Sequence, residues 1–341
     1  MTFLVTRKMS PELAARVRAS VRGRRARPVS GRAPRTVALV RYCLLAALLA
    51  AVGGVLLLRR QVHDELAAER AALLDAVRQQ AARFTPEDHQ ALERARHWLA
   101  QVAAADPLDD LIVDELRSAA GLGATLTRPT LYVRGPQESF LSPEGLQESA
   151  SSSSKDAFVL CLNEPPAARS ERAILGRTRT AYAGGKRAAQ ATDQVERLHA
   201  ALVTAPLIAP AWQERVENAP GRRELLQLRR ELDRAPFDAA ARALKSRQVL
   251  FLIDDPADTA GPTELDGERP HPVRVGLVDL EGDRPLLLLR RRVDPSWISE
   301  AIRAEYARGM DSCALALDVR RDVLGEGEEE RSEGPAHRPS H

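Results

Sequence analysis

One stretch of the sequence constrains the fold of the chain more than any other. Residues 42–58, YCLLAALLAAVGGVLLL, are seventeen uncharged and mostly apolar residues, with Arg41 before them and Arg59 and Arg60 after them. As a helix they span roughly 26 Å, close to the ~30 Å hydrocarbon core of a bilayer. Because no polar face interrupts the run, it predicts a transmembrane helix over 37–60, whose flanking arginines reach the lipid headgroups.

The segment reads as an anchor that stays in the mature chain. A cleaved signal peptide is the alternative, but 41 residues would have to form its charged leader, and the run ends in Leu-Leu-Leu-Arg-Arg without a small-x-small cleavage site. The twenty residues before the run hold seven arginines, whereas the twenty after it hold four arginines and four acids. The positive-inside rule therefore predicts a cytoplasmic N-terminus and an extracytoplasmic bulk.

The charge of the chain is concentrated in its N-terminal arm. Residues 1–58 carry eleven Lys/Arg and one acid, so the remainder carries about −7 of the total charge of +3. We expect the arm, 1–36, to be disordered and to contact anionic lipid, and the acidic body to bind no nucleic acid. The chain is rich in arginine and alanine, which suggests GC-rich coding and a bacterial source. We therefore expect the membrane to be a bacterial inner membrane.

A helical stalk is predicted over 61–105. Leu66, Leu73, Val77 and Phe84 recur at spacings of seven and four, which suits either a coiled coil that makes a homodimer or an amphipathic helix that packs on its own domain. Thr85 followed by Pro86, Glu87 and Asp88 is a helix start. A third helix is predicted from Asp106, with Gly121 as its stop.

The remainder, 106–324, predicts an α+β domain with a mostly antiparallel sheet of about five strands and helices on one face. The expected strands are 130–135, 156–162, 248–255, 271–281 and 284–293, the last two joined by a hairpin at 281–283. The serine-rich run 141–155 reads as an exposed loop and 167–248 as several helices. A helix follows Asp294, and 313–323 either continues it or ends the sheet. We expect the tail, 325–341, to be disordered.

Candidate sites are few. A polar connection carries Asp254, Asp255, Asp258, Glu264 and Asp266, which are weak candidates for a Ca²⁺ site because their spacing matches no EF-hand loop. His271 follows them, so a His–Asp general base is conceivable, although no nucleophile motif accompanies it. No metal, nucleotide or other cofactor motif occurs, and no cofactor is predicted.

Two cysteines suit a disulfide. If the domain is extracytoplasmic, Cys161 and Cys313 can be oxidised, whereas the alternative is two buried free thiols. Cys43 lies in the apolar run.

The leading functional hypothesis is a single-pass membrane protein whose outer domain serves protein–protein interaction or envelope assembly. The order of arm, span, stalk and α+β domain resembles in outline that of bacterial inner-membrane assembly and scaffold proteins, but no motif carries this to a family. The alternatives are an extracytoplasmic ligand-sensing domain and an enzyme of unrecognised type, with the acidic connection and His271 as the place to look.

Overall fold

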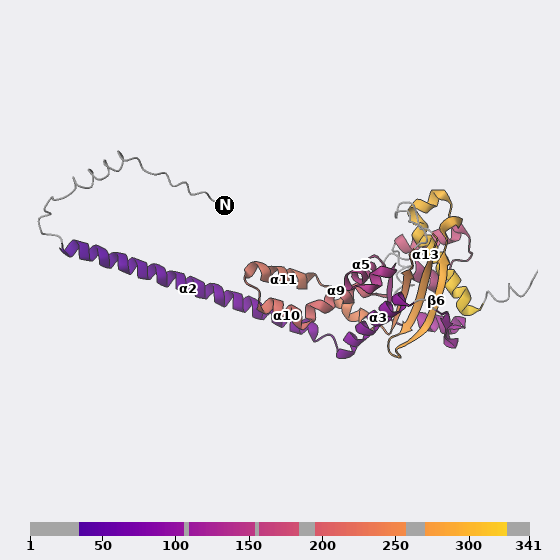
Figure 1. Cartoon of the computed structure of the whole chain (residues 1–341), viewed down its shortest axis with the longest axis horizontal. Coiled ribbons are helices and arrows are strands. Elements are labelled where there is room, and N and C mark those ends of the chain that lie inside the picture. The colour runs from indigo at the N-terminus through magenta and orange to yellow at the C-terminus, as the bar shows by residue number, and fades with distance from the viewer. Residues whose placement is uncertain (1–33, 106–108, 154–156, 184–194, 257–269, 326–341) are drawn as a thin grey trace, which may run out of the picture. The chain divides into compact units, whose positions relative to one another are not determined.

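The computed structural model describes residues 34–105, 109–153, 157–183, 195–256 and 270–325 (Figure 1). The chain divides into two compact units, 1–67 and 68–341, and each is described by itself. The predicted arm up to residue 33 and the tail from residue 326 lie outside the described residues.

The first unit contains most of the long helix α2 (Pro34–Ala81), which continues into the second unit. The second unit begins at Ala68, inside the range predicted as stalk. Its helices are α3 (Pro86–Ala104), α4 (Ala119–Leu126), α5 (Pro143–Ser152), α6 (Phe158–Asn163), α7 (Glu171–Ala183), α9 (Leu198–Ile208), α10 (Pro210–Glu217), α11 (Arg222–Arg234), α12 (Phe237–Ala243) and α13 (Glu300–Leu324). Short 3-10 helices are η1 (Asp114–Leu116), η2 (Gln137–Leu141) and η5 (Pro295–Trp297).

The sheet has six strands in the order β1-β6-β5-β4-β2-β3. They are β1 (Leu111–Ile112), β2 (Thr130–Pro136), β3 (Val195–Arg197), β4 (Gln248–Asp254), β5 (His271–Asp279) and β6 (Arg284–Val293). β1, β6, β5 and β4 pair antiparallel, whereas β4, β2 and β3 pair parallel. The α+β class is confirmed, with a mixed sheet of six strands in place of a mostly antiparallel sheet of about five.

Both faces of this sheet are covered, so the prediction of helices on one face was wrong. Alternate strand residues such as Leu252 and Val275 share one core cluster with Phe158 of α6 and Met310 of α13. Phe251, which precedes Leu252 in β4, is also fully buried. It lies on the opposite face of the sheet, where α3 contacts β4. A strand covered on both faces is apolar throughout, and the uninterrupted run VLFLI at 249–253 already fits two covering layers.

Three sequence-based assignments were wrong. Residues 158–163 form helix α6 and not a central strand, because a short apolar run fits a buried helix as well as a strand. The serine-rich run contains helix α5, capped by Ser142, with Leu146 and Ala150 buried. The helix predicted from Asp106 is absent from the described residues that follow 106–108, which form β1 and η1, and Gly121 lies inside α4, capped by Ser118.

Other predictions were confirmed. The four strands at 130–135, 248–255, 271–281 and 284–293 exist, and β5 and β6 form the expected hairpin. At the start of α3, the Asp88 amide donates to Thr85 Oγ1 at 3.3 Å and the Thr85 amide donates to Asp88 at 2.8 Å, a capping box. Helix α13 continues through 313–323.

The end of α2 packs on its own compact unit. Leu73, Val77 and Phe84 are buried, and the Phe84 ring lies 6.4 Å from that of Phe237 in α12. Arg70 donates to the carbonyl of Ala219 at 2.5 Å, beside α10 and α11 (Figure 1). These contacts fit an amphipathic helix that packs on its own domain, which was the alternative to a coiled coil. Nothing in the described residues supports a coiled coil. A homodimer stays a prediction.

Side chains protect the open edges of the sheet. β3 covers only the start of β2, and beyond it the Arg134 amide donates to Ser153 Oγ at 2.8 Å. β1 covers only two residues of β6, and beyond it the Arg290 amide donates to Asp110 at 3.0 Å. Because these backbone groups are engaged, the two edges are poor templates for a partner strand.

Candidate functional site

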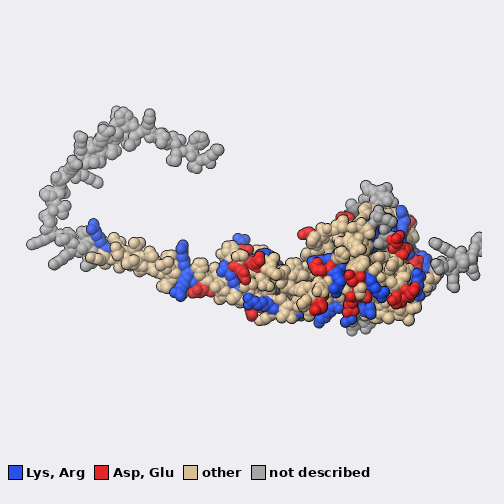
Figure 2. All heavy atoms as spheres, turned by 60° about the horizontal axis from the view of Figure 1, so that its bottom comes forward, with Lys and Arg blue, Asp and Glu red and all other residues tan. Residues whose placement is uncertain are grey.

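The apolar run of α2 is the first candidate site. Ten of its large apolar side chains are between 49% and 76% exposed: Tyr42, Leu44, Leu45, Leu48, Leu49, Val52, Val55, Leu56, Leu57 and Leu58. Among the described residues, α2 is the one helix long and apolar enough to cross a membrane. Figure 2 shows an uncharged band along this helix with basic side chains on either side of it. In the sequence the apolar run is flanked by Arg41, Arg59 and Arg60.

The second candidate is a polar cluster where β4 ends, on the sheet face that packs against α13. Arg134 of β2 is only 1% exposed, and its Nε and Nη2 donate to the Asp254 carboxylate at 2.9–3.2 Å. Its Nη1 donates to Ser312 Oγ of α13. His271 of β5 completes the cluster, with Nε2 3.3 Å from Asp254 Oδ1. The structure thus brings together the Asp254–His271 pair that the sequence suggested.

The electrostatics of the cluster fix its charge state. Burial by itself raises the pKa of Asp254, but the positive charge of Arg134 and hydrogen bonds from His271 and Arg134 outweigh burial and lower this pKa from 3.8 to about 2. Asp254 is therefore ionised at neutral pH. A general base works best with a pKa near the working pH, and Asp254 is far from that condition.

The neighbouring Asp255 points to the opposite face of the sheet. Its carboxylate accepts from Arg274 Nε at 2.7 Å and lies 3.1 Å from Arg290 Nη2. The buried Arg274 also donates to backbone carbonyls at the end of α3, including that of Val102 at 2.8 Å. Two adjacent carboxylates thus fasten one end of β4 to α13 on one side and to α3 on the other.

The predicted metal ligands that the structure describes do not point toward one another. Asp254 and Asp255 lie on opposite faces, and each is bound by a buried arginine. Asp258, Glu264 and Asp266 lie outside the described residues. Within the described part of the chain, no group of three or more His, Cys, Asp or Glu side chains is arranged to hold a metal ion.

Cys161 and Cys313 form a disulfide in the structure, with Cα atoms 5.2 Å apart. Both residues are fully buried in the core between α6 and α13. The bond therefore joins the helix that the sequence misread as a strand to the last helix of the fold. Cys43 is a free and exposed cysteine.

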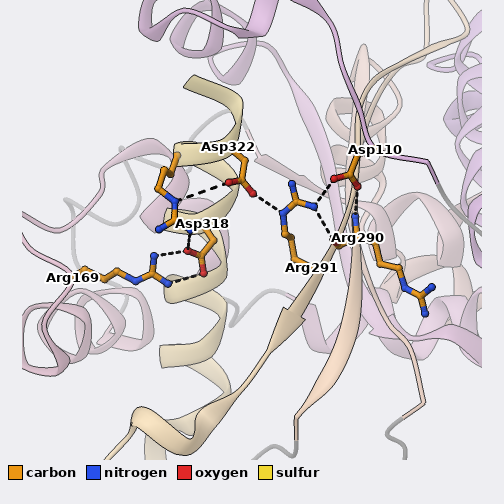
Figure 3. A network of polar contacts seen from close by, with 7 residues as sticks. Asp110, Arg169, Arg290, Arg291, Asp318 and Asp322 are labelled. Carbon is orange, nitrogen blue, oxygen red and sulfur yellow. Dashed lines mark hydrogen bonds and ion pairs between the residues drawn. The ribbon is translucent and has the colours of Figure 1, made fainter. Parts of the chain in front are cut away.

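A surface network holds the C-terminal turns of α13 (Figure 3). Asp322 accepts from Arg291 of β6 at 2.5 Å, and Arg291 also donates to Asp110 at 2.7 Å. One turn earlier, Asp318 accepts from Arg169 at 2.7 Å and from Arg321 at 2.9 Å. The charges alternate in sign, and their side chains are between 24% and 50% exposed. Solvent therefore screens each pair, each contributes little to stability on its own, and the network mainly orients α13.

Two hollows of about 490 Å³ lie elsewhere. One lies between α10 and α11 and is lined by Arg215, Pro220, Gly221, Arg223, Glu224, Gln227 and Leu228. The other is lined by Glu87, Asp88, Ala91, Arg94, Leu244, Lys245, Ser246, Arg247, Leu280 and Glu281. Neither includes Asp254 or His271, so these hollows and the polar cluster are separate features.

Comparisons with protein-family models, curated proteins and solved structures found no match to this chain. Its function must therefore be argued from its own geometry.

Sequence reasoning missed Arg134 and Arg274. Each interrupts an apolar strand, in TLYVRG and HPVRVGLVD. A charged residue inside a buried strand requires a partner, and the acids at the end of the neighbouring strand are the nearest candidates. That signal was present, but only the strand order shows that β4 lies between β2 and β5.

Proposed function

We propose that the chain is a single-pass membrane protein that presents its second unit outside the cytoplasm for protein–protein interaction or envelope assembly. The observation that carries the proposal is the exposed apolar run of α2. Fully burying a large apolar side chain contributes about 1.5–3 kcal/mol. Because these ten are only half to three-quarters exposed, a lipid environment recovers roughly 9–18 kcal/mol.

Two further features support the orientation. The basic arm precedes the run, whereas charges are balanced after it. The Cys161–Cys313 disulfide suits an oxidising compartment such as the bacterial periplasm.

The state of the polar cluster favours an interaction role over catalysis. Asp254 and Asp255 are held by arginines that are themselves buried, an arrangement that fixes elements in place. Figure 2 shows acidic and basic side chains interspersed on the visible face of this unit, a surface suited to polar contacts with other proteins.

Membrane insertion is tested first. The full chain should stay in the membrane pellet after alkaline carbonate extraction, and Leu48→Arg combined with Leu49→Arg should release it, because two charges near the middle of the run oppose insertion. Leu141→Arg is the matched control, since Leu141 is an exposed leucine of the second unit. Release of the unaltered chain by carbonate would contradict the anchor.

Orientation is tested by alkaline phosphatase fused after residue 341, which is active only outside the cytoplasm. An active fusion there, with an inactive fusion after residue 36, is the expected result, and the reverse pattern would overturn the orientation.

The interaction role is tested by crosslinking intact membranes and purifying the chain in detergent. A partner should co-purify with the unaltered chain and with the Leu141→Arg control. Recovery of the chain alone, under several crosslinking chemistries, would count against an interaction role.

A further inference from the structure

Helix α11 has an exposed basic face. It buries Leu225, Leu228 and Leu232 against the second unit. Its exposed residues are five arginines, one aspartate, one leucine and one glutamine: Arg222, Arg223, Leu226, Gln227, Arg229, Arg230, Asp233 and Arg234. We call this surface the α11 basic face. Its two other acids, Glu224 and Glu231, are half-buried at the side.

Four arginines of this face have no partner within the described chain. Arg222 lies 3.5 Å from Glu69, but no hydrogen bond or ion pair to a described residue is made by the side chains of Arg223, Arg229, Arg230 and Arg234. Elsewhere in the second unit exposed arginines commonly have acidic partners, as Arg83 has Asp238 and Arg247 has Glu281. The uncompensated positive charge of α11 therefore suits an anionic partner.

Chain connectivity keeps this face near the membrane. The ion pair of Arg222 with Glu69, and the hydrogen bond of Arg70 to Ala219, hold α11 against the second unit's part of α2. Glu69 lies eleven positions after Leu58, the last residue of the apolar run. Even a fully extended chain of that length reaches at most roughly 36–40 Å. Whatever arrangement the two units adopt, the tether gives α11 a high effective concentration at the bilayer surface.

We propose that the α11 basic face docks on the anionic phospholipid headgroups of the membrane that holds α2. Arginines contact lipid phosphates, and Leu226, 42% exposed among them, enters the headgroup boundary. The proposal rests on the proposed membrane anchorage and adds a second lipid contact to it, on a surface other than the N-terminal arm.

The test uses the full chain reconstituted in vesicles of phosphatidylglycerol or of phosphatidylcholine. A Leu226→Cys substitution in a Cys43→Ala chain carries an environment-sensitive fluorophore, and the disulfide-bonded cysteines are not labelled. We expect a blue-shifted emission in phosphatidylglycerol that is lost at 1 M salt, where the Debye length falls to about 3 Å. The same label at Leu141→Cys, another exposed leucine, is the positional control and should not respond.

Charge is tested with two matched variants. The blue-shifted and unshifted emission of the label at position 226 give the ratio of docked to undocked α11. Arg223→Gln, Arg230→Gln and Arg234→Gln together should reduce this ratio by at least about tenfold, because each basic residue near an anionic surface adds to the binding free energy. The control variant, Arg128→Gln, Arg172→Gln and Arg292→Gln, removes three exposed arginines outside α11 and should leave the ratio unchanged.

The outcomes separate this proposal from the anchorage. If the chain resists carbonate but position 226 gives the same emission in both lipids, or responds equally to both triple variants, docking of α11 is overturned and the anchor stands. If carbonate releases the chain from both kinds of vesicle, the anchorage itself fails.

Discussion

Replacing Asp254 with asparagine tests the role of the polar cluster most directly. The substitution preserves side-chain shape but removes the charge that compensates Arg134, which is 1% exposed. A buried ion pair broken on one side costs about 3–5 kcal/mol, because a charge is left without a partner in a poorly solvated site. We expect the free energy of unfolding at pH 7 to fall by roughly 3 kcal/mol.

The lowered pKa of Asp254 also predicts how the free energy of unfolding changes with pH. The folded pKa of Asp254 is lowered from 3.8 to about 2, so between these values the unfolded state binds more protons than the folded state. The stabilisation is complete above about pH 5 and is lost as pH falls towards 2. Lowering the pKa by this amount corresponds to roughly 2.5 kcal/mol. The difference between the unaltered chain and Asp254→Asn should therefore shrink by about that amount on acidification.

The assay is guanidinium unfolding of the full chain in mild detergent, followed by tryptophan fluorescence from pH 7 down to pH 2. Asp318→Asn is the matched control, since Asp318 belongs to the partly exposed surface network of Figure 3 and its replacement should cost no more than about 1 kcal/mol. If the two variants unfold at the same denaturant concentration at pH 7, the cluster does not stabilise the fold as argued.

Three further predictions concern the second unit. Replacing both Cys161 and Cys313 with serine should cost about 3–5 kcal/mol, because their bond closes a loop across 152 residues; non-reducing peptide mapping that finds both thiols free would reject the bond. Gly276→Ala should cost about 1–3 kcal/mol, since a Cβ there would lie 2.1 Å from the Phe251 ring. Its control, Gly176→Ala in helix α7, meets nothing within 4 Å and should be neutral or stabilising in the same unfolding assay. Thr85→Ala should cost about 1 kcal/mol by removing the capping box, and an unchanged melting temperature would contradict that role.

The sequence predicted those elements whose signal is local. The helix start at Thr85 and the hairpin between β5 and β6 depend on a few neighbouring residues. The strands from 248 and 271 carry long runs of β-branched and apolar residues. Helix α6 was predicted wrongly because its five buried apolar residues suit a strand as well as a helix, and its packing against α13 decides between them.

The candidate site was predictable only in part. Asp254 and Asp255 stand out as acids at the end of a predicted strand, but their arginine partners come from two other strands, Arg134 of β2 and Arg274 of β5. Whether two adjacent acids bind a metal or neutralise arginines depends on which strands flank them. That order is a property of the sheet and not of the acidic run.

By itself, the sequence determined the apolar run, its flanking arginines and the basic arm before it, because hydrophobic length and net charge are additive along a chain. Only the tertiary structure decided the rest: Asp254 and Asp255 face opposite ways, Cys161 meets Cys313, and the unpaired arginines of α11 share one exposed face. These features depend on distances between residues up to 152 positions apart, and such distances are set by how the helices and strands pack together.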